Sequence, residues 1–212
     1  MGRGNVALEA VRIRAHFERF PASLKGSLVM RGADGNPHQV RLDDARAVEL
    51  AGRGPVSMGM SAATLEVAPN RDLFVPFEFP VAELAPGWYA IECTVAIDGA
   101  PETVRPGARF AVPWPRGATR RDQVPVGKSI ETGAGTVRID ELGCKSDSIE
   151  LRYGGAETSF TLAADGARLP VLESAFDDGS AAGSVVAYPL LKTQSVVRIS
   201  VRDADPIEVP LP

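Results

Sequence analysis

The end of a phosphate-binding loop is the nearest approach to a catalytic motif in this chain, with the order Gly127, Lys128 and Ser129. In such a loop, backbone N–H groups of a glycine-rich turn point at phosphate oxygens and the lysine reaches the terminal phosphate. The motif also needs a glycine five residues before Gly127, where this chain has Asp122. A strand, and not the required helix, is expected after Ser129. We therefore interpret the segment as a turn at the start of a strand.

Metal binding would depend on the two histidines, His16 and His38, which are far apart in the chain. His16 falls on the polar face of its predicted strand, and His38 follows a proline in a turn. A protein metal site needs several converging His, Cys or carboxylate ligands. We interpret both histidines as surface residues, and we expect neither a metal nor any other cofactor.

Acidic residues are numerous, but their spacing indicates no hydrolytic site. The pairs Asp43-Asp44 and Asp177-Asp178, and Glu141, have the positions of solvated turn or edge residues. Asp177-Asp178-Gly179 lacks the alternating oxygen ligands of a calcium-binding loop, so a polar loop is expected there. No Gly-x-Ser-x-Gly elbow occurs, and two histidines offer little to a Ser-His-Asp triad. We expect no catalytic residues.

Arginines form two small groups. Arg12 and Arg14 are predicted on the outer face of the first strand, and a second group lies near the middle of the chain: Arg116, Arg120 and Arg121. One interpretation is a patch for an anion or an acidic polymer. The interpretation we favour is that exposed charge discourages edge-to-edge strand pairing. The net charge is −4 and no whole face is basic, so nucleic acid is not an expected partner.

The two tryptophans are the residues best suited to a contact surface. Trp88 falls on the face of its strand opposite the predicted core, and Trp114 lies in the segment that we expect to link two domains. Either indole could pack the domains together, or present a flat ring to a sugar or a protein. We expect domain packing. The candidate ligand or interdomain surface consists of Trp88, Trp114, Arg116, Arg120 and Arg121.

The elements that would position these residues are strands, most clearly in residues 77–99. After a corner at Pro86-Gly87, apolar and other residues alternate, as in a strand with one buried face. The residues expected to face inward are Tyr89, Ile91, Cys93, Val95 and Ile97. Asp98-Gly99 then supplies a favoured hairpin turn.

Other segments of the first half also alternate. Residues 11–18 and 24–30 predict strands, and the turn signal at 33–37 leads to a further strand, for which a hairpin is the simplest arrangement. Residues 43–50 are the only stretch that we consider for a short helix, and residues 51–61 are expected to form a loop. Pro76 and Pro80 should lie at strand ends or edges, because proline cannot donate to a ladder.

Two domains are expected. Residues 113–125 break the periodicity and mix proline, glycine and charge, as an interdomain linker does. We place the boundary near Thr119, which gives domains of residues 1–118 and 119–212, each long enough for one sandwich. Cys93 and Cys144 then fall in different domains and are expected to be free, buried thiols. Strand candidates in the second domain are residues 136–142, 148–153, 158–162, 185–191, 195–201 and 207–211.

The order Leu84-x-Pro86-Gly87-x-Tyr89 resembles the tyrosine corner of immunoglobulin-like and fibronectin-type sandwiches. The resemblance implies that the Tyr89 hydroxyl bonds to backbone a few residues upstream. In antibody-type domains a disulfide cysteine follows the tyrosine by two residues, where this chain has Ile91. The implied class is therefore the broad sandwich without its disulfide.

The second half, residues 124–211, is similar in layout to immunoglobulin-like domains of bacterial extracytoplasmic stress-sensor and anti-sigma proteins. The shared segments are residues 126–130, 136–139, 165–166, 188–190 and 207–211. This similarity implies a non-enzymatic module. The first half is similar in general appearance to accessory sandwiches of bacterial cell-surface glycan and polymer enzymes.

Together these observations predict an all-β protein of two consecutive immunoglobulin-like antiparallel β-sandwich domains. The dispersed 21 Gly and 17 Pro fit many short strands joined by turns. We expect a bacterial, non-catalytic module for protein interaction or scaffolding, with a protein partner; a carbohydrate-binding accessory module with a glycan ligand is the alternative. No leader or membrane segment is indicated, so the expected compartment is cytoplasmic as the chain stands, or extracytoplasmic if it is a fragment.

Overall fold

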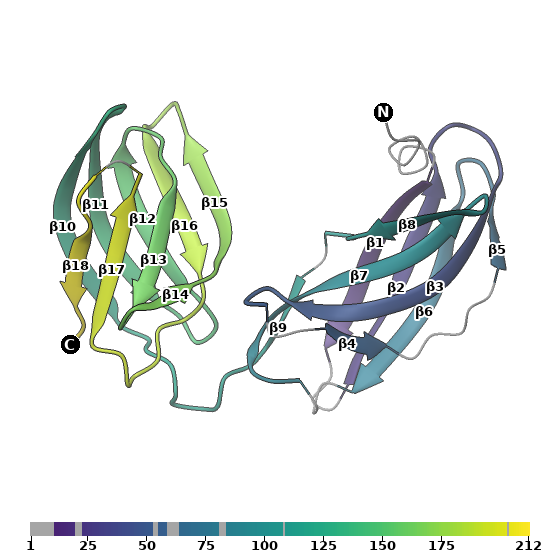
Figure 1. Cartoon of the computed structure of the whole chain (residues 1–212), viewed down its shortest axis with the longest axis horizontal. Coiled ribbons are helices and arrows are strands. Elements are labelled where there is room, and N and C mark those ends of the chain that lie inside the picture. Colours follow the sequence, from purple (N-terminus) through teal and green to yellow (C-terminus); the bar gives the residue numbers. More distant parts are fainter. Residues whose placement is uncertain are drawn as a thin grey trace. The chain divides into compact units, whose positions relative to one another are not determined.

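A computed structural model describes residues 11–19, 23–52, 55–58, 64–80, 84–107, 109–202 and 204–212. In these ranges the chain is all-β, with eighteen strands and no helix (Figure 1). It follows that no described helix is long and apolar enough to cross a membrane. The chain divides into two compact units, Met1–Val112 and Pro113–Pro212. The prediction of an all-β chain is confirmed.

The first unit contains two antiparallel sheets. The strand order in the first sheet is β1 (Val11–Arg19), β2 (Ser23–Gly32) and β6 (Asp72–Pro80). The second sheet has the order β4 (Pro55–Met58), β3 (His38–Glu49), β7 (Gly87–Ile97) and β8 (Ala100–Val104). Two short strands also pair with it: β5 (Thr64–Val67) with β3 and β9 (Arg109–Val112) with β7.

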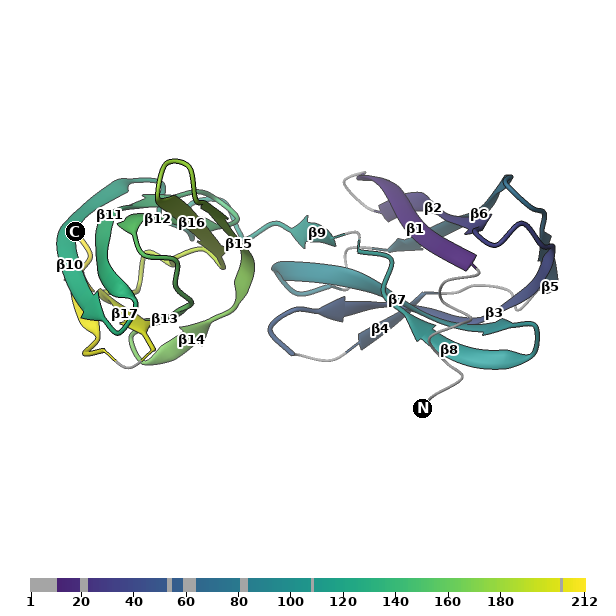
Figure 2. The same ribbon diagram turned by 90° about the horizontal axis from the view of Figure 1, so that it is seen from above.

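The two sheets of the first unit form separate layers in Figure 2 and share one buried core. Leu28 and Met30 of β2 join Ile91 and Cys93 of β7 in this core, and none of the four side chains is exposed. Each buried apolar side chain contributes about 1.5–3 kcal/mol to the stability of such a core. All five residues of β7 that were predicted to face inward are buried: Tyr89, Ile91, Cys93, Val95 and Ile97.

The corner before β7 is closed by a side chain, as the resemblance implied. The Tyr89 hydroxyl donates a hydrogen bond to the carbonyl oxygen of Ala85 at 2.9 Å, while the Tyr89 ring stacks on Phe110 with centroids 5.4 Å apart. At the other end of β7, Asp98 and Gly99 have φ values of 49° and 85°, which suit a two-residue hairpin turn. β7 is therefore fixed at both ends.

The corner bond gives a first prediction. Replacing Tyr89 by phenylalanine removes the hydroxyl but keeps the ring on Phe110, so we expect the first unit to lose about 1 kcal/mol of unfolding free energy. Urea unfolding followed by circular dichroism measures this loss. A variant as stable as the wild type would show that the corner bond does not stabilise the fold.

Three expectations for the first unit are wrong. Residues 43–49 belong to strand β3, and Leu50 begins the turn that follows. A bulge between Leu42 and Asp44 shifts the buried positions and makes the spacing resemble a helix. The turn at residues 33–37 carries the chain from β2 into the other sheet, so β2 and β3 are not a hairpin. The expected loop at 51–61 contains β4 among its described residues. Pro76, as expected, lies on an edge strand, β6.

The second unit also has two antiparallel sheets, which enclose a common interior in Figure 2. The first has the order β10 (Gln123–Thr132), β11 (Gly135–Cys144), β12 (Ile149–Gly155), β16 (Ala182–Ala187) and β15 (Val171–Asp177). The second has the order β14 (Ala167–Leu169), β13 (Phe160–Ala164), β17 (Val196–Val201) and β18 (Ile207–Pro210). All six strand candidates correspond to strands, while β10, β14 and β15 were not among them.

An aromatic cluster joins the two sheets of the second unit. The Tyr153 ring of β12 meets Phe160 of β13 edge-on at 4.7 Å and stacks with Phe176 of β15 at 6.0 Å. Gly183 of β16 is the register partner of both Tyr153 and Phe176. A methyl group at Gly183 would overlap the Tyr153 ring, with Cε1 2.5 Å away and Cζ and Oη closer still. The absence of a side chain at Gly183 therefore allows the ring to lie on the backbone.

Candidate binding surfaces

The five residues proposed from the sequence do not form one cluster within either unit. Trp88 lies in β7 of the first unit and is half-buried, whereas the other four precede β10 in the second unit. Trp114 meets Tyr188 edge-on with ring centroids 5.7 Å apart, so its indole contacts its own unit. Arg116 and Arg121 are exposed.

The Arg120 side chain is largely buried and donates hydrogen bonds to backbone groups of its own unit. Its side chain is 11% exposed, and its guanidinium donates to the carbonyl oxygens of Pro212 at 2.6 Å and Gln194 at 3.0 Å. Its backbone N–H donates to Leu190, and Lys192 donates to Ala118. The residues expected to form an interdomain linker thus pair with the second unit from Ala118 onward, because backbone groups at residues 190–192 accept and donate there. Arg120 therefore binds the C-terminal residue through Nη1 and the Gln194 backbone through Nη2.

Trp88 belongs to a row of half-buried apolar residues on the outer side of the second sheet of the first unit. Trp88 and Ala90 alternate with the buried positions of β7. Val48 of β3 is the register partner of Ala90, and Ala111 of β9 is the register partner of Trp88. The N–H of Leu50 donates to the Trp88 carbonyl at 2.8 Å. We call Val48, Leu50, Trp88, Ala90 and Ala111 the Trp88 row.

A buried carboxylate borders the Trp88 row. Glu92 follows Ala90 on the same face of β7, and its side chain is 9% exposed. Arg46 of β3 donates to one Glu92 oxygen through Nε at 2.8 Å and also through Nη2, while Arg105 donates to the other through Nε at 2.9 Å. Hydrogen bonds from Arg46, and then from Arg105, lower the pKa of Glu92 despite its burial. The result is a fixed, charged boundary beside the apolar row.

His38 was expected at the surface, and its side chain is instead 8% exposed. Its Nδ1 lies 2.6 Å from Asp98 Oδ2, and its Nε2 lies 2.8 Å from Asp34 Oδ1. Asp34 belongs to the turn between the sheets, while Asp98 belongs to the β7–β8 turn, so one imidazolium joins two turns. The hydrogen bonds to Asp34 and Asp98 raise the pKa of His38, and the bond from His38 lowers the pKa of Asp34 to about 2. The pKa of Asp98 is lowered by the same histidine.

This arrangement predicts a stability that falls with rising pH. Because the pKa of His38 is raised on folding, the contribution of the charged ring is complete below its unfolded pKa of about 6.5 and is lost as pH rises through the folded value. The two aspartates act in the opposite sense, and their contribution is lost only in strong acid. We expect the urea midpoint of the first unit to decrease as the pH rises above about 6.5 and through the raised pKa of His38. A His38→Gln variant should lack this decrease, and a variant with the wild-type pH profile would contradict the assignment.

The remaining sequence motifs make the contacts of ordinary strand and turn residues. Gly127 has φ of 58° at a bulge between Pro125 and Lys128, inside a strand and not before a helix, and Lys128 donates to the Glu208 carbonyl. Asp177 accepts from the Gly179 N–H and the Ser180 hydroxyl, as a polar turn residue does. In the described residues no three His, Cys, Asp or Glu side chains converge as metal ligands.

Both cysteines are free and buried, as expected. Burial raises the pKa of the Cys93 thiol to about 12 and that of Cys144 to about 11. Neither thiol is therefore ionised near neutral pH, and reactivity of the kind shown by catalytic thiolates is not indicated.

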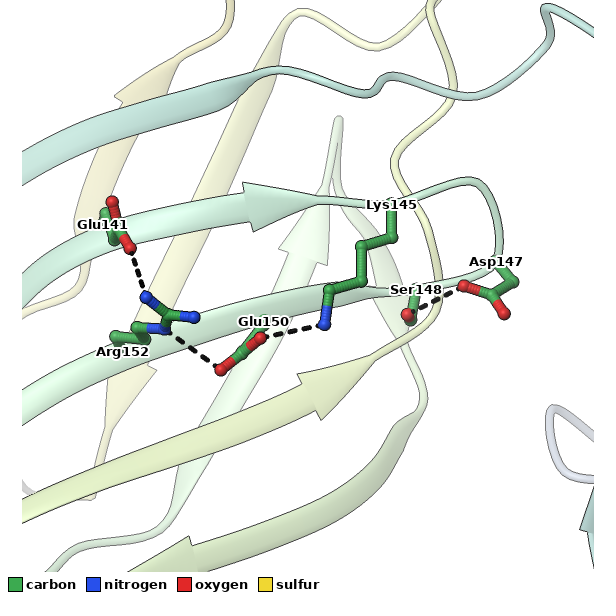
Figure 3. Close-up of polar contacts among 6 residues, drawn as sticks. All are labelled: Glu141, Lys145, Asp147, Ser148, Glu150 and Arg152. Atoms are coloured by element: carbon green, nitrogen blue, oxygen red, sulfur yellow. Dashed lines mark hydrogen bonds and ion pairs between the residues drawn. The ribbon is translucent and has the colours of Figure 1, made fainter.

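A charged ladder covers part of the outer face of the second unit (Figure 3). Arg152 of β12 donates to Glu141 of β11 and to Glu150, each at 3.0 Å, and Lys145 donates to the second Glu150 oxygen at 2.9 Å. Lys145 and Arg152 lower the pKa of Glu150. Both cations are more than half exposed, so the ladder contributes little to stability and keeps this face polar.

Several solved structures are similar to this chain. The crystal structure of the conserved domain protein from Bacillus anthracis is similar over 96% of this chain and 88% of that chain, with 10% sequence identity and a TM-score of 0.37. No protein-family model and no curated protein matches the chain. A similarity at this level assigns no function.

Proposed function

We propose that the protein is a non-catalytic interaction module and that the Trp88 row is its contact surface for a protein partner. The observation that carries the proposal is the half-burial of five apolar residues in register on the outer side of one sheet. Outward positions of a solvated sheet are usually polar. An apolar row there is the kind of surface that a partner protein covers.

The charges around the row fit the anatomy of protein interfaces. Tryptophan and arginine are enriched among residues that dominate binding energy, and a polar rim commonly surrounds the apolar centre. Here Glu92 borders the row, and its negative charge is paired with Arg46 and Arg105. Because these hydrogen bonds hold the side chains of Glu92, Arg46 and Arg105 before binding, less conformational entropy is lost when the complex forms.

We further propose that both units are immunoglobulin-like sandwiches, and that the second unit is related in layout to the domains of bacterial stress-sensor and anti-sigma proteins. The Tyr89 to Ala85 bond supports the first part, since it is the bond of a tyrosine corner. An experimental structure of each unit, compared strand by strand with such domains, tests this proposal. A different order of strand connections would contradict it.

The function is tested by capture of a partner. The intact chain, immobilised through its C-terminus, is exposed to lysate of the organism that encodes it, and retained proteins are identified by mass spectrometry. The proposal requires one defined protein that is retained reproducibly and that binds again as a purified component. Repeated failure under native conditions would contradict an interaction role.

A further inference from the structure

Strand β15 lies at one end of the first sheet of the second unit (Figure 1). In the part of the chain that the structure describes, β16 is the only strand that pairs with it. Its register with β16 is continuous over residues 173–177, because its bulge lies at the start, between Val171 and Glu173. In an antiparallel ladder, alternate residues direct their N–H and C=O groups toward opposite sides of the strand. Residues 173–177 therefore present backbone donors and acceptors along an outer edge that no described strand covers.

The other described edge strands have features that discourage pairing with a further strand, namely proline, cationic side chains, bulges or short length. Proline occurs in five of them: Pro55 in β4, Pro76 and Pro80 in β6, Pro101 in β8, Pro125 in β10 and Pro210 in β18. The strands β5, β9 and β14 have at most four residues, and β1 has three arginines in its sequence. By contrast, β15 has seven residues and contains no proline, lysine or arginine. Among the described edge strands, β15 is therefore the most open to a further strand.

The charges of β15 disfavour pairing with a second copy of this chain. Glu173 and Asp177 are its only charged residues, and both are exposed. Hydrogen bonds from the Ser180 hydroxyl and the Gly179 N–H lower the pKa of Asp177, so this carboxylate is charged near neutral pH. Antiparallel pairing centred on Ala175 would place Glu173 of each copy opposite Asp177 of the other, and like charges directly opposite each other are destabilising. A strand with basic side chains would instead be attracted.

A polar cavity of about 290 Å³ lies beside the same strand. Residues 174–176 of β15 line it together with residues 157–159, which belong to the connection from β12 to β13. Its wall includes the exposed Glu157 carboxylate and serine and threonine hydroxyl groups, but no lysine or arginine. These groups accept hydrogen bonds, so they suit a lysine ammonium or an arginine guanidinium, which only donates. In strand addition, backbone hydrogen bonds supply affinity and pockets for alternate side chains supply specificity.

From these features we propose that the outer edge of β15 binds an extended, basic segment of another protein as an added strand. The backbone of this segment pairs with residues 173–177. Because the side chains of a strand alternate between two faces, those on one face meet the cavity and Glu157, and those on the other meet Glu173 and Asp177. The site belongs to the second unit and differs from the Trp88 row, so its occupation does not depend on the partner proposed for that row.

An NMR titration of the intact, isotope-labelled chain tests the proposal. The probe is a seven-residue peptide of alternating lysine and valine, which has the length of β15. A glutamate and valine peptide is the comparison for charge, and the lysine peptide with every backbone N–H methylated is the comparison for strand pairing. We expect the lysine peptide to shift the amide signals of residues 157–159 and 173–177 and to slow hydrogen exchange in β15, and we expect neither comparison peptide to bind.

Three results would overturn the proposal. The first is the absence of shifts at β15 with the lysine peptide. The second is equal binding by either comparison peptide, which would exclude basic charge or backbone pairing as the cause. The third is a set of β15 shifts that appears when the protein concentration is raised without peptide, because these shifts would assign the edge to a second copy.

Charge-reversal variants locate the site. Glu157→Lys and Glu173→Lys alter exposed side chains, and each should weaken binding of the lysine peptide at least about fivefold without changing the fold. Glu131→Lys is the matched control, because Glu131 is an exposed acid on β10, at the opposite edge of the same sheet. This variant should bind within about twofold of the wild type, since exposed charges that far apart are screened. Equal losses in all three variants, or wild-type binding by both Glu157→Lys and Glu173→Lys, would overturn the assignment to β15.

Discussion

Replacing Gly183 by alanine is expected to lower the unfolding free energy of the second unit by about 3 kcal/mol, the upper part of the range for overpacked cores. The added methyl would overlap the Tyr153 ring, whose Cε1 atom would lie 2.5 Å away. Phe160 and Phe176 pack against the ring, with centroids 4.7 Å and 6.0 Å away. The ring must leave this packing, or the strands must separate, to accept one carbon atom. Urea unfolding of the intact chain measures the loss.

Two controls make this expectation specific. Gly133→Ala places a methyl group in open space and should leave stability within about 0.5 kcal/mol of the wild type. Combining Gly183→Ala with Tyr153→Ala should cost less than the sum of the single changes, because the cavity left by the ring accepts the methyl. Additive losses would show that the clash with Tyr153 is not the cause.

Replacing Trp88 by alanine should weaken the complex with the captured partner at least about 30-fold, equivalent to about 2 kcal/mol of binding free energy. The indole is the largest member of the Trp88 row, and it is half-buried in the free protein. Its removal takes away the centre of the proposed interface. Calorimetric titration of the purified partner measures the change, and circular dichroism verifies that the variant remains folded.

Phe74→Ala is the matched control for this prediction. Phe74 is an aromatic residue of the same unit, 61% exposed on β6 of the other sheet. Its removal should change the affinity less than about twofold, since it lies outside the proposed surface. A large loss of affinity with Phe74→Ala and none with Trp88→Ala would show that the partner binds the other sheet.

The sequence predicted most reliably the strands that have one apolar and one polar face. In β7 the alternation and the Asp98-Gly99 turn agree, so its bounds and its buried face are confirmed. A bulge changed the apparent period of residues 43–50, and a local pattern cannot distinguish a bulged strand from a short helix. β15 was missed because six of its seven residues are not buried, which leaves no alternating pattern to detect.

The candidate surfaces were less predictable because they depend on pairing between distant segments. Trp88 was identified from its place in the strand, but Val48 and Ala111 join it only through the register of β3 and β9. The aromatic cluster of Tyr153, Phe160 and Phe176 needed three separate strands, and a glycine on a fourth, to form. His38 was misassigned because its partner Asp98 lies sixty residues away in the chain. A conspicuous signal was still present: Asp34, His38 and the Asp98-Gly99 turn all lie at predicted turns.

The most direct test of the proposed interaction surface uses Trp88 as its own reporter. The protein has two tryptophans, so Trp114→Phe leaves Trp88 as the only indole and keeps an aromatic ring against Tyr188. Acrylamide quenching of Trp88 fluorescence is measured with and without saturating partner. We predict that the partner protects Trp88 and reduces the quenching constant at least twofold. An unchanged quenching constant in a complex that has formed would contradict the claim that the Trp88 row is the contact surface.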